Sequence, residues 1–347
     1  MNLSAGPGVA VREFHTASGP VDYVLFAGRR LCGVVEAKPE GTTLSGYSEQ
    51  ASRYIADVPK HLVREEGQVR FEYVASGTEL LFRDHADPNP ASRRVFAFHR
   101  PETIERWLRE PATLRRRLQS MPALPTDGLR VCQIEAVTAI ERSMAANHPR
   151  ALVQMATGAG KTFTACSLSY RLLAHAGFRR ILFLADRGNL VRQTRDEYLA
   201  YRPPGAGRSF SEIYNVQKMG AAGLDKDAQI VVATIQRVYS ALTGRELAED
   251  DEEASAFEAA SADTERLVAY NPSIPIESFD LVITDECHRS IYGTWRQVLA
   301  DHAARVLAIG ARFAAETGRV GRVVDRQVGV AQDFIAVDIG HGHFRRG

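Results

Sequence analysis

The sequence is poor in cysteine, has almost no net charge and contains no long apolar run. Its 347 residues include four cysteines, which are Cys32, Cys132, Cys166 and Cys287. They lie far apart and none form a CxxC pair, so the pattern indicates neither a zinc site nor a disulfide framework and fits a reducing cytoplasm. No apolar run reaches the ~18 residues of a membrane span, and the first residues lack the apolar core of a secretory signal.

The charge balance limits how the protein could bind nucleic acid. The formal net charge is +1, so a globally basic surface is excluded and a DNA partner would have to bind a local patch. A hydrophobic content of 45% and a charged content of 24% are typical of a soluble globular chain. The length is sufficient for two or three domains.

Four stretches of different character follow one another along the chain. Residues 1–84 contain short β-like runs, and residues 85–128 form a Pro- and Arg-rich connector with one predicted helix at "PETIERWLRE" and a solvated basic run at 115–117. Residues 129–311 alternate apolar runs such as "ALVQM", "RRILFLAD" and "FDLVITDE" with helical segments, interrupted by an acidic insert at 246–266. This alternation predicts βαβ units and a parallel sheet. Residues 312–347 show no clear architecture.

A phosphate-binding loop is predicted at "QMATGAGKTFTA", which follows an apolar run and opens a helical segment. Backbone N–H groups of the loop could surround the phosphates of ATP, Lys161 would reach the β- and γ-phosphates, and Thr162 would hold Mg²⁺. The remaining predicted loop residues are Thr157, Gly158, Ala159 and Gly160. Met155 departs from the simplest consensus, which has glycine at the first position.

A second acidic motif supports this interpretation. The run "FDLVITDECHRS" would place Asp285 and Glu286 at the carboxyl end of a strand, where open α/β sheets bind ligands. Asp285 would hold Mg²⁺ and Glu286 would polarise the attacking water. Upstream, Gln133 could read the adenine edge through its amide, although an ordinary helix N-terminus would explain it as well.

Polar residues also follow two of the other predicted strands. They could contact a nucleic-acid backbone or belong to solvated loops. These residues are Arg187, Asn189, Gln193, Thr234 and Gln236.

The stretch "VVEAKPEGT" places Glu36 and Lys38 two residues apart, so on a strand they share a face. A hairpin centred near Arg29 would put Asp22 opposite Glu36, with Cβ atoms ~4.5–5.5 Å apart. Two carboxylates at so short a distance repel each other unless a cation lies between them. Mg²⁺ suits this position, because it takes one or two carboxylates and keeps several waters. Lys38 would orient the attacking water or stabilise charge on the phosphate. The alternative is a surface salt-bridge ladder worth ~0–1 kcal/mol.

Together these motifs resemble the first motor lobe of superfamily 2 helicases. More narrowly, "YNPSIPIESFDLVITDECHRSIYGTWRQVL", "VVEAKPEGTTLSGYSEQASRY" and "QMATGAGKTF" resemble the R subunit of type I restriction enzymes, over most of residues 11–300. The resemblance implies an α/β protein with a PD-(D/E)xK-like nuclease core in residues 1–84 and a RecA-like helicase lobe in residues 129–311. It also implies a cytoplasmic subunit that hydrolyses ATP, pulls and cuts double-stranded DNA, and works with methyltransferase (M) and specificity (S) subunits. Gln50 and Tyr54 match a pair that supports the nuclease site in that family.

The sequence departs from the family at both ends. The nuclease core is expected to be incomplete at its N-terminus, and after "RVLAIGA" the family's "LTATP"-like motif is not found. Residues 312–347 are too few for a second motor lobe, so a truncated R subunit with slow ATP turnover is expected. Two alternatives stay open: a general superfamily 2 helicase with a structural hairpin, and an inactive remnant that binds nucleotide or DNA.

Overall fold

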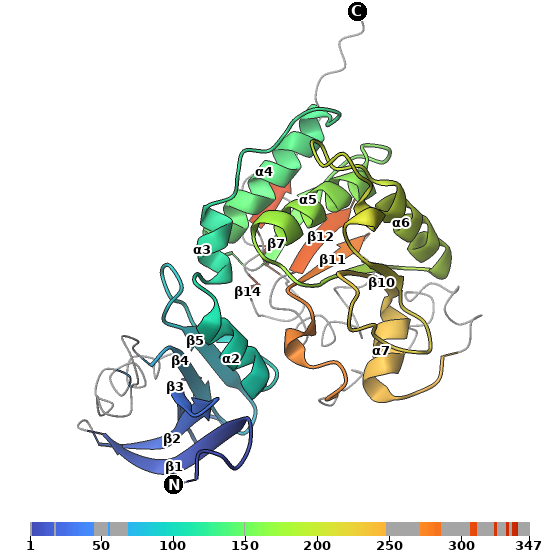
Figure 1. Cartoon of the computed structure of the whole chain (residues 1–347). Helices are drawn as coiled ribbons and strands as arrows, with labels where there is room; N and C mark the ends of the chain where they lie inside the picture. The colour runs from blue at the N-terminus through green and yellow to red at the C-terminus, as the bar shows by residue number, and fades with distance from the viewer. Residues whose placement is uncertain are drawn as a thin grey trace, which may run out of the picture. The chain divides into compact units, whose positions relative to one another are not determined.

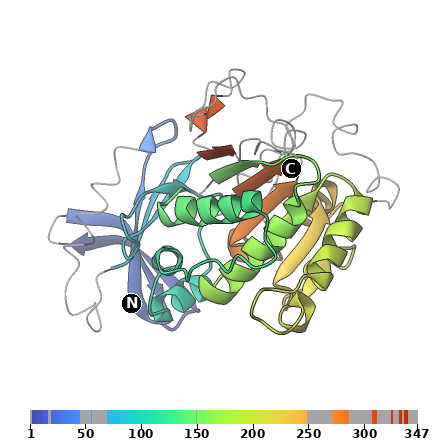
Figure 2. The same cartoon turned by 90° about the horizontal axis from the view of Figure 1, so that it is seen from above.

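The computed structural model divides the chain into two compact units. The first comprises residues 1–116 together with Pro275–Glu277, and the second comprises residues 117–274 and 278–347 (Figures 1 and 2). The structure describes residues 2–16, 19–44, 55, 69–148, 150–247 and 271–285, and the backbone of four short strands after residue 305. Within this part of the chain, no helix combines the length and apolar character needed to cross a bilayer.

The first unit is built on a six-stranded sheet in the order β1-β2-β3-β4-β5-β6. Only β3 and β4 pair in parallel. Its elements are β1 (Gly8–Thr16), β2 (Gly19–Ala27), β3 (Arg30–Ala37), β4 (Phe71–Ala75), β5 (Leu80–Asp84), β6 (Arg93–Arg94) and the helix α2 (Pro101–Arg109). The helix predicted at "PETIERWLRE" is confirmed, whereas β1 was not predicted.

The two faces of this sheet pack against different parts of the chain. Val35 and Tyr73 belong to a cluster with Ile104 of α2. The neighbouring Val34 belongs to another cluster, with Val24 and Ile55. Because successive residues of a strand point to opposite faces, α2 covers one face and the Val24–Val34 cluster lies on the other.

The turn between β2 and β3 is a tight hairpin, as predicted from "AGRR". Ala27 pairs with Arg30, so the loop has two residues, Gly28 and Arg29. Both have positive φ, +52° and +67°, the combination that type I′ turns require. This turn fixes the register of the two strands that carry Asp22 and Glu36.

The second unit contains a seven-stranded sheet in the order β15-β7-β12-β11-β8-β10-β9, in which every pairing is parallel. Its strands are β7 (Arg150–Gln154), β8 (Ile181–Ala185), β9 (Val216–Lys218), β10 (Ile230–Thr234), β11 (Leu281–Asp285), β12 (Val306–Gly310) and β15 (Ile335–Asp338). The predicted α/β class and parallel sheet are confirmed. The short strands β13 (Val323–Val324) and β14 (Ala331–Gln332) form a separate antiparallel pair.

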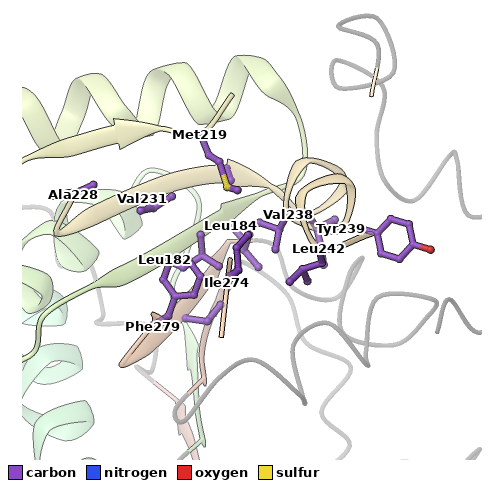
Figure 3. Packing of buried hydrophobic residues seen from close by; sticks show 13 residues of the cluster. Leu182, Leu184, Met219, Ala228, Val231, Val238, Tyr239, Leu242, Ile274 and Phe279 are labelled. Carbon is purple, nitrogen blue, oxygen red and sulfur yellow. The ribbon is translucent and has the colours of Figure 1, made fainter. Parts of the chain in front are cut away.

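Helices cover both faces of this sheet. They are α4 (Val131–Ala145), α5 (Lys161–His175), α6 (Gly188–Ala200) and α7 (Ile235–Thr243). Leu182 and Leu184 of β8 pack with Val238 and Leu242 of α7 (Figure 3). The intervening Phe183 points to the opposite face and meets the ring of Tyr198 on α6 at 6.3 Å. Helices α6 and α7 therefore lie on opposite faces.

Two expectations differ from the structure. The basic run at residues 115–117 is not simply solvated, because Arg115 is buried and its Nη1 lies 2.9 Å from Asp87 Oδ2, while Arg117 Nε donates to the Ala176 carbonyl at 2.7 Å. These residues lie on α3 (Leu114–Gln119), where consecutive side chains point about 100° apart. Within residues 312–347, expected to have no clear architecture, β15 pairs with β7.

Candidate functional site

Asp22 and Glu36 lie opposite each other on neighbouring strands of the first unit. Tyr23 pairs with Val35 and Val24 with Val34, so continuing this antiparallel register by one residue places Asp22 opposite Glu36. Both carboxylates share a sheet face with Val24 and Val34, and that face is not the one covered by α2. The geometry matches the arrangement expected from the hairpin.

Hydrogen bonds join these acids to the end of β3. The Ala37 N–H donates to Asp22 Oδ2 at 2.7 Å, and the Lys38 ammonium donates to Glu36 Oε1 at 2.7 Å. Glu36 is only 5% exposed. Lys38 is anchored by its own N–H, which donates to the Ala75 carbonyl on β4 at 2.8 Å. Asp22, Glu36 and Lys38 are therefore brought into one cluster.

This cluster suits a hard divalent cation that keeps most of its waters. Within the described residues, no group of three or more His, Cys, Asp or Glu side chains gathers as a complete metal cage. Two opposed carboxylates are nevertheless the donor set with which Mg²⁺ is usually held, the other positions being filled by water and phosphate oxygens. The ion pair of Lys38 with Glu36 shows that the site already holds a positive charge beside the carboxylate.

One further acidic residue on this sheet face was missed from the sequence. Glu72 pairs in register with Val34 and so shares the face of Glu36. It is 1% exposed and its Oε2 lies 2.7 Å from Nε2 of His85. A glutamate between the apolar residues of "VRFEYV" was the only sequence signal, because its partner lies on another strand.

The predicted phosphate loop connects β7 to α5 in the second unit. Gly160 is the N-cap of α5, and the first helical turn carries no acidic residue. Gly158 and Gly160 have φ values of +78° and +84°, which favour glycine. Thr157 and Gly158 are exposed, and Ala159, Lys161 and Thr162 are half-buried. An open loop leading into a helix N-terminus without acids fits the phosphates of a nucleotide.

Gln133 contacts this loop directly. Its Nε2 donates to the Ala159 carbonyl at 3.2 Å, and its Oε1 accepts from the Arg130 N–H at 2.9 Å. Arg130 Nη1 also donates to the Gly158 carbonyl at 2.8 Å. Gln133 therefore lies beside the predicted nucleotide site, but its amide is engaged with the loop and its own helix.

Asp285 lies at the same edge of the sheet as the loop. It ends β11 and pairs with Ile309 of β12, which in turn pairs with Val153 of β7. With one strand between them, the ends of β7 and β11 are about 10 Å apart, twice the usual strand spacing. Asp285 therefore lies at the same edge of the sheet as the predicted phosphate loop, with one strand between them.

Three predicted residues lie outside the described part of the chain, namely Gln50, Tyr54 and Glu286. Two predicted nucleic-acid contacts are buried instead. Thr234 caps α7 by accepting from the Arg237 N–H at 3.2 Å, and Gln236 is only 6% exposed. For Thr234, the structural role of a helix cap explains the residue.

Comparison with known proteins places these motifs in a family. Residues 127–314 match the family model described as type III restriction enzyme, res subunit. Since this match covers more than half of the chain, the protein belongs to that family. Residues 4–77 match a second model, the second domain of the type I restriction enzyme EcoKI endonuclease subunit.

Similar proteins of known name are endonuclease subunits of type I restriction enzymes. The EcoKI endonuclease subunit of Escherichia coli (strain K12) is 27% identical over 82% of this chain, and the EcoAI endonuclease subunit of Escherichia coli is 27% identical over 80%. The chain spans only 26% and 30% of the length of these two proteins. A fragment structure of an HsdR subunit from Vibrio vulnificus YJ016 matches 91% of this chain and 53% of that one, at 20% identity and a TM-score of 0.31. The predicted resemblance to type I R subunits is confirmed.

Proposed function

We propose that this chain contains the nuclease and nucleotide-binding parts of the R subunit of a type I restriction endonuclease. In this proposal the first unit contains the PD-(D/E)xK-like nuclease core and the second is a RecA-like motor lobe. The activity is Mg²⁺-dependent cleavage of double-stranded DNA, coupled to ATP-driven translocation. The observation that carries the proposal is the cluster of Asp22, Glu36 and Lys38 in the same chain as a phosphate loop with Asp285 at its sheet edge.

The nuclease chemistry depends on charge placed beside the scissile phosphate. Asp22 and Glu36 would hold Mg²⁺, which when bound supplies positive charge that activates water and offsets charge on the phosphate. Lys38, whose ammonium lies 2.7 Å from Glu36 Oε1, would orient the attacking water or offset charge on a phosphate oxygen. The Ala37 N–H fixes Asp22, so the carboxylate does not have to reorganise when DNA binds.

The nucleotide site uses backbone donors and two side chains. N–H groups of the loop and of the first turn of α5 would surround the phosphates of ATP, with Lys161 reaching the β- and γ-phosphates. Thr162 and Asp285 would hold the accompanying Mg²⁺, and Glu286 would polarise water. Gln133 would lie beside the bound nucleotide, because its Nε2 donates to the Ala159 carbonyl of the loop.

The family also suggests the partners and location of the protein. We propose double-stranded DNA as the substrate, methyltransferase (M) and specificity (S) subunits as partners, and the cytoplasm as the compartment. In this assignment another subunit would supply the recognition of a particular DNA sequence.

The nuclease assignment is tested by Lys38→Ala in the full chain assembled with M and S subunits. We expect cleavage of duplex DNA in Mg²⁺ and ATP to fall at least 100-fold, because one catalytic charge is lost, with nucleotide affinity unchanged. Arg30→Ala is the matched control, since it removes an exposed cation from the same strand. Equal cleavage by wild type and Lys38→Ala would refute the nuclease site.

The nucleotide site is tested by Lys161→Ala and equilibrium titration with ATP and Mg²⁺. Losing charge-assisted hydrogen bonds worth about 1.5–3 kcal/mol should weaken binding about 10- to 150-fold. Lys218→Ala, an exposed lysine of the same unit, should bind normally. DNA-stimulated ATP turnover without any Mg²⁺-dependent cleavage would favour a translocase alone, and nucleotide binding without turnover would favour an inactive remnant.

A further inference from the structure

Arg94 lies in the same cross-strand row as the proposed nuclease pair. Glu36 of β3 pairs with Val74 of β4, and Val74 pairs with Leu81 of β5. Leu81 in turn pairs with Arg94 of β6. Directly paired residues of neighbouring strands point to the same face of a sheet, so Arg94 shares the face of Glu36. The whole row belongs to the first unit.

The row also sets the distance between Arg94 and the acidic pair. β3 and β6 are separated by β4 and β5, so three strand spacings of about 4.8 Å give roughly 14 Å between the Cα atoms of Glu36 and Arg94. The side chains between them are apolar, and Val74 and Leu81 pack with Leu44. The row therefore carries its charged side chains at its two ends.

Arg94 is accessible to a large ligand. Its side chain is 75% exposed, compared with 15% for Lys38 and 22% for His85. β6 is two residues long and stands at one edge of the six-stranded sheet. A DNA strand can therefore reach the guanidinium without any rearrangement of the core.

An ion pair with Glu79 orients the Arg94 guanidinium. Glu79 is the residue just before β5, and its side chain is 30% exposed. Exposed ion pairs of this kind contribute little to stability. A phosphate diester presents two oxygens to a planar guanidinium and can accept two parallel N–H donors from it. Phosphate oxygens can therefore replace the Glu79 carboxylate at small cost.

We propose that Arg94 binds a backbone phosphate of the duplex DNA whose cleavage is assigned to Asp22, Glu36 and Lys38. It is a positioning residue, because it holds the DNA strand roughly 14 Å from the acidic pair and does not contact the scissile phosphate. The inference rests on the proposed nuclease function and adds to it the direction of the DNA backbone, which runs across the sheet from β3 toward β6.

The test is the salt dependence of duplex binding by the full chain, read by fluorescence anisotropy without Mg²⁺ so that the DNA stays intact. Arg94→Ala should reduce the steepness of log affinity against log salt by about 0.9, the effect of losing one phosphate contact. With the two curves meeting near 1 M salt, the affinity at about 0.1 M should be about 8-fold below that of the wild type. Arg94→Lys keeps the charge and should keep the wild-type slope.

Arg12→Ala is the matched control. Arg12 is also an exposed arginine in an ion pair, in its case with Glu13. It pairs in register with Tyr23, which belongs to the cluster on the face covered by α2. Its removal changes the net charge by the same amount as Arg94→Ala and should leave the salt slope unchanged.

The outcomes separate this contact from the proposed function. Equal slopes for the wild type and Arg94→Ala would overturn the proposal, and Arg94 would then only discourage pairing of the edge strand with another sheet. An equal reduction in Arg12→Ala would overturn it too, because the effect would come from net charge alone. If Lys38→Ala cleaves DNA as the wild type does, the nuclease assignment is wrong, yet the salt slopes still decide whether Arg94 binds DNA.

Discussion

Replacing Gly160 by alanine tests how Gln133 holds the predicted phosphate loop. Gly158 and Gly160 both have positive φ, so alanine is strained at either position. They differ in their surroundings: a Cβ atom at 158 would have nothing within 4 Å, whereas one at 160 would lie 2.4 Å from Gln133 Nε2. Gly158→Ala is therefore a matched control that carries the backbone strain without the collision.

The magnitudes of the two effects differ enough to be measured. Left-handed backbone costs about 1–2 kcal/mol for an L-residue, which is all that Gly158→Ala should lose. Gly160→Ala must also displace Gln133 and break its bonds to the Ala159 carbonyl and the Arg130 N–H. At about 0.5–1.5 kcal/mol for each bond, the expected loss is about 2–5 kcal/mol.

The assay is equilibrium urea unfolding of the full chain, followed by circular dichroism. In a Gln133→Ala background the side chain that collides is gone, so the two glycine variants should then differ by less than about 0.5 kcal/mol. Equal destabilisation by the two variants in the wild-type background would refute the reasoning. So would a difference between them that survives the removal of Gln133.

Three further outcomes follow from buried groups. A thiol reagent at pH 8 should modify Cys132 and leave Cys32 intact in peptide maps, because burial raises the pKa of the Cys32 thiol to about 12; rapid labelling of Cys32 in the native chain would contradict this. Burial also holds the pKa of His99 well below its usual value. Below about pH 6.5 the unfolded chain therefore binds more protons than the folded chain. As the pH is lowered, the free energy of unfolding should decrease by up to about 1.4 kcal/mol per pH unit. Urea titrations at several pH values should show a shallower slope for His99→Phe, and equal slopes would exclude this origin. Arg171→Met should lower the free energy of unfolding by about 3–5 kcal/mol, because Glu141 Oε1 would lose the guanidinium 2.6 Å away and stay buried without it. Adding Glu141→Leu should recover much of this stability in thermal unfolding. A double variant as unstable as the single one would contradict this account.

Features with a local cause could be predicted from the sequence. The apolar runs of the parallel sheet and the two-residue turn at Gly28 and Arg29 each depend on a few neighbouring residues. The opposition of Asp22 and Glu36 followed from that turn, because a hairpin fixes the register of its strands. The glycine-rich turn that opens α5 could be predicted for the same reason, since its glycines and Lys161 are neighbours in the sequence.

Features that depend on distant partners could not be predicted. β1 has no fully buried residue, so its apolar alternation is weak, and it is recognised only by its pairing with β2. The bond between Glu72 and His85 joins two strands, and Glu277 caps a helix that begins at residue 101. Arg115 looked solvated because its neighbours are arginines, yet its partner Asp87 lies outside the helix.

The strand order has a consequence for how the second unit is made. β7, the strand that leads into the predicted phosphate loop, is flanked by β12 and β15, so neither of its neighbours exists until residues 306–310 and 335–338 have been synthesised. At about 5–20 residues per second, the ribosome needs roughly 8–30 s after β7 to reach the first of them. During that interval the apolar edge of Ala151, Leu152 and Val153 has no permanent neighbour in this sheet. Chaperone capture of nascent chains should therefore be strongest between the synthesis of β7 and that of β12.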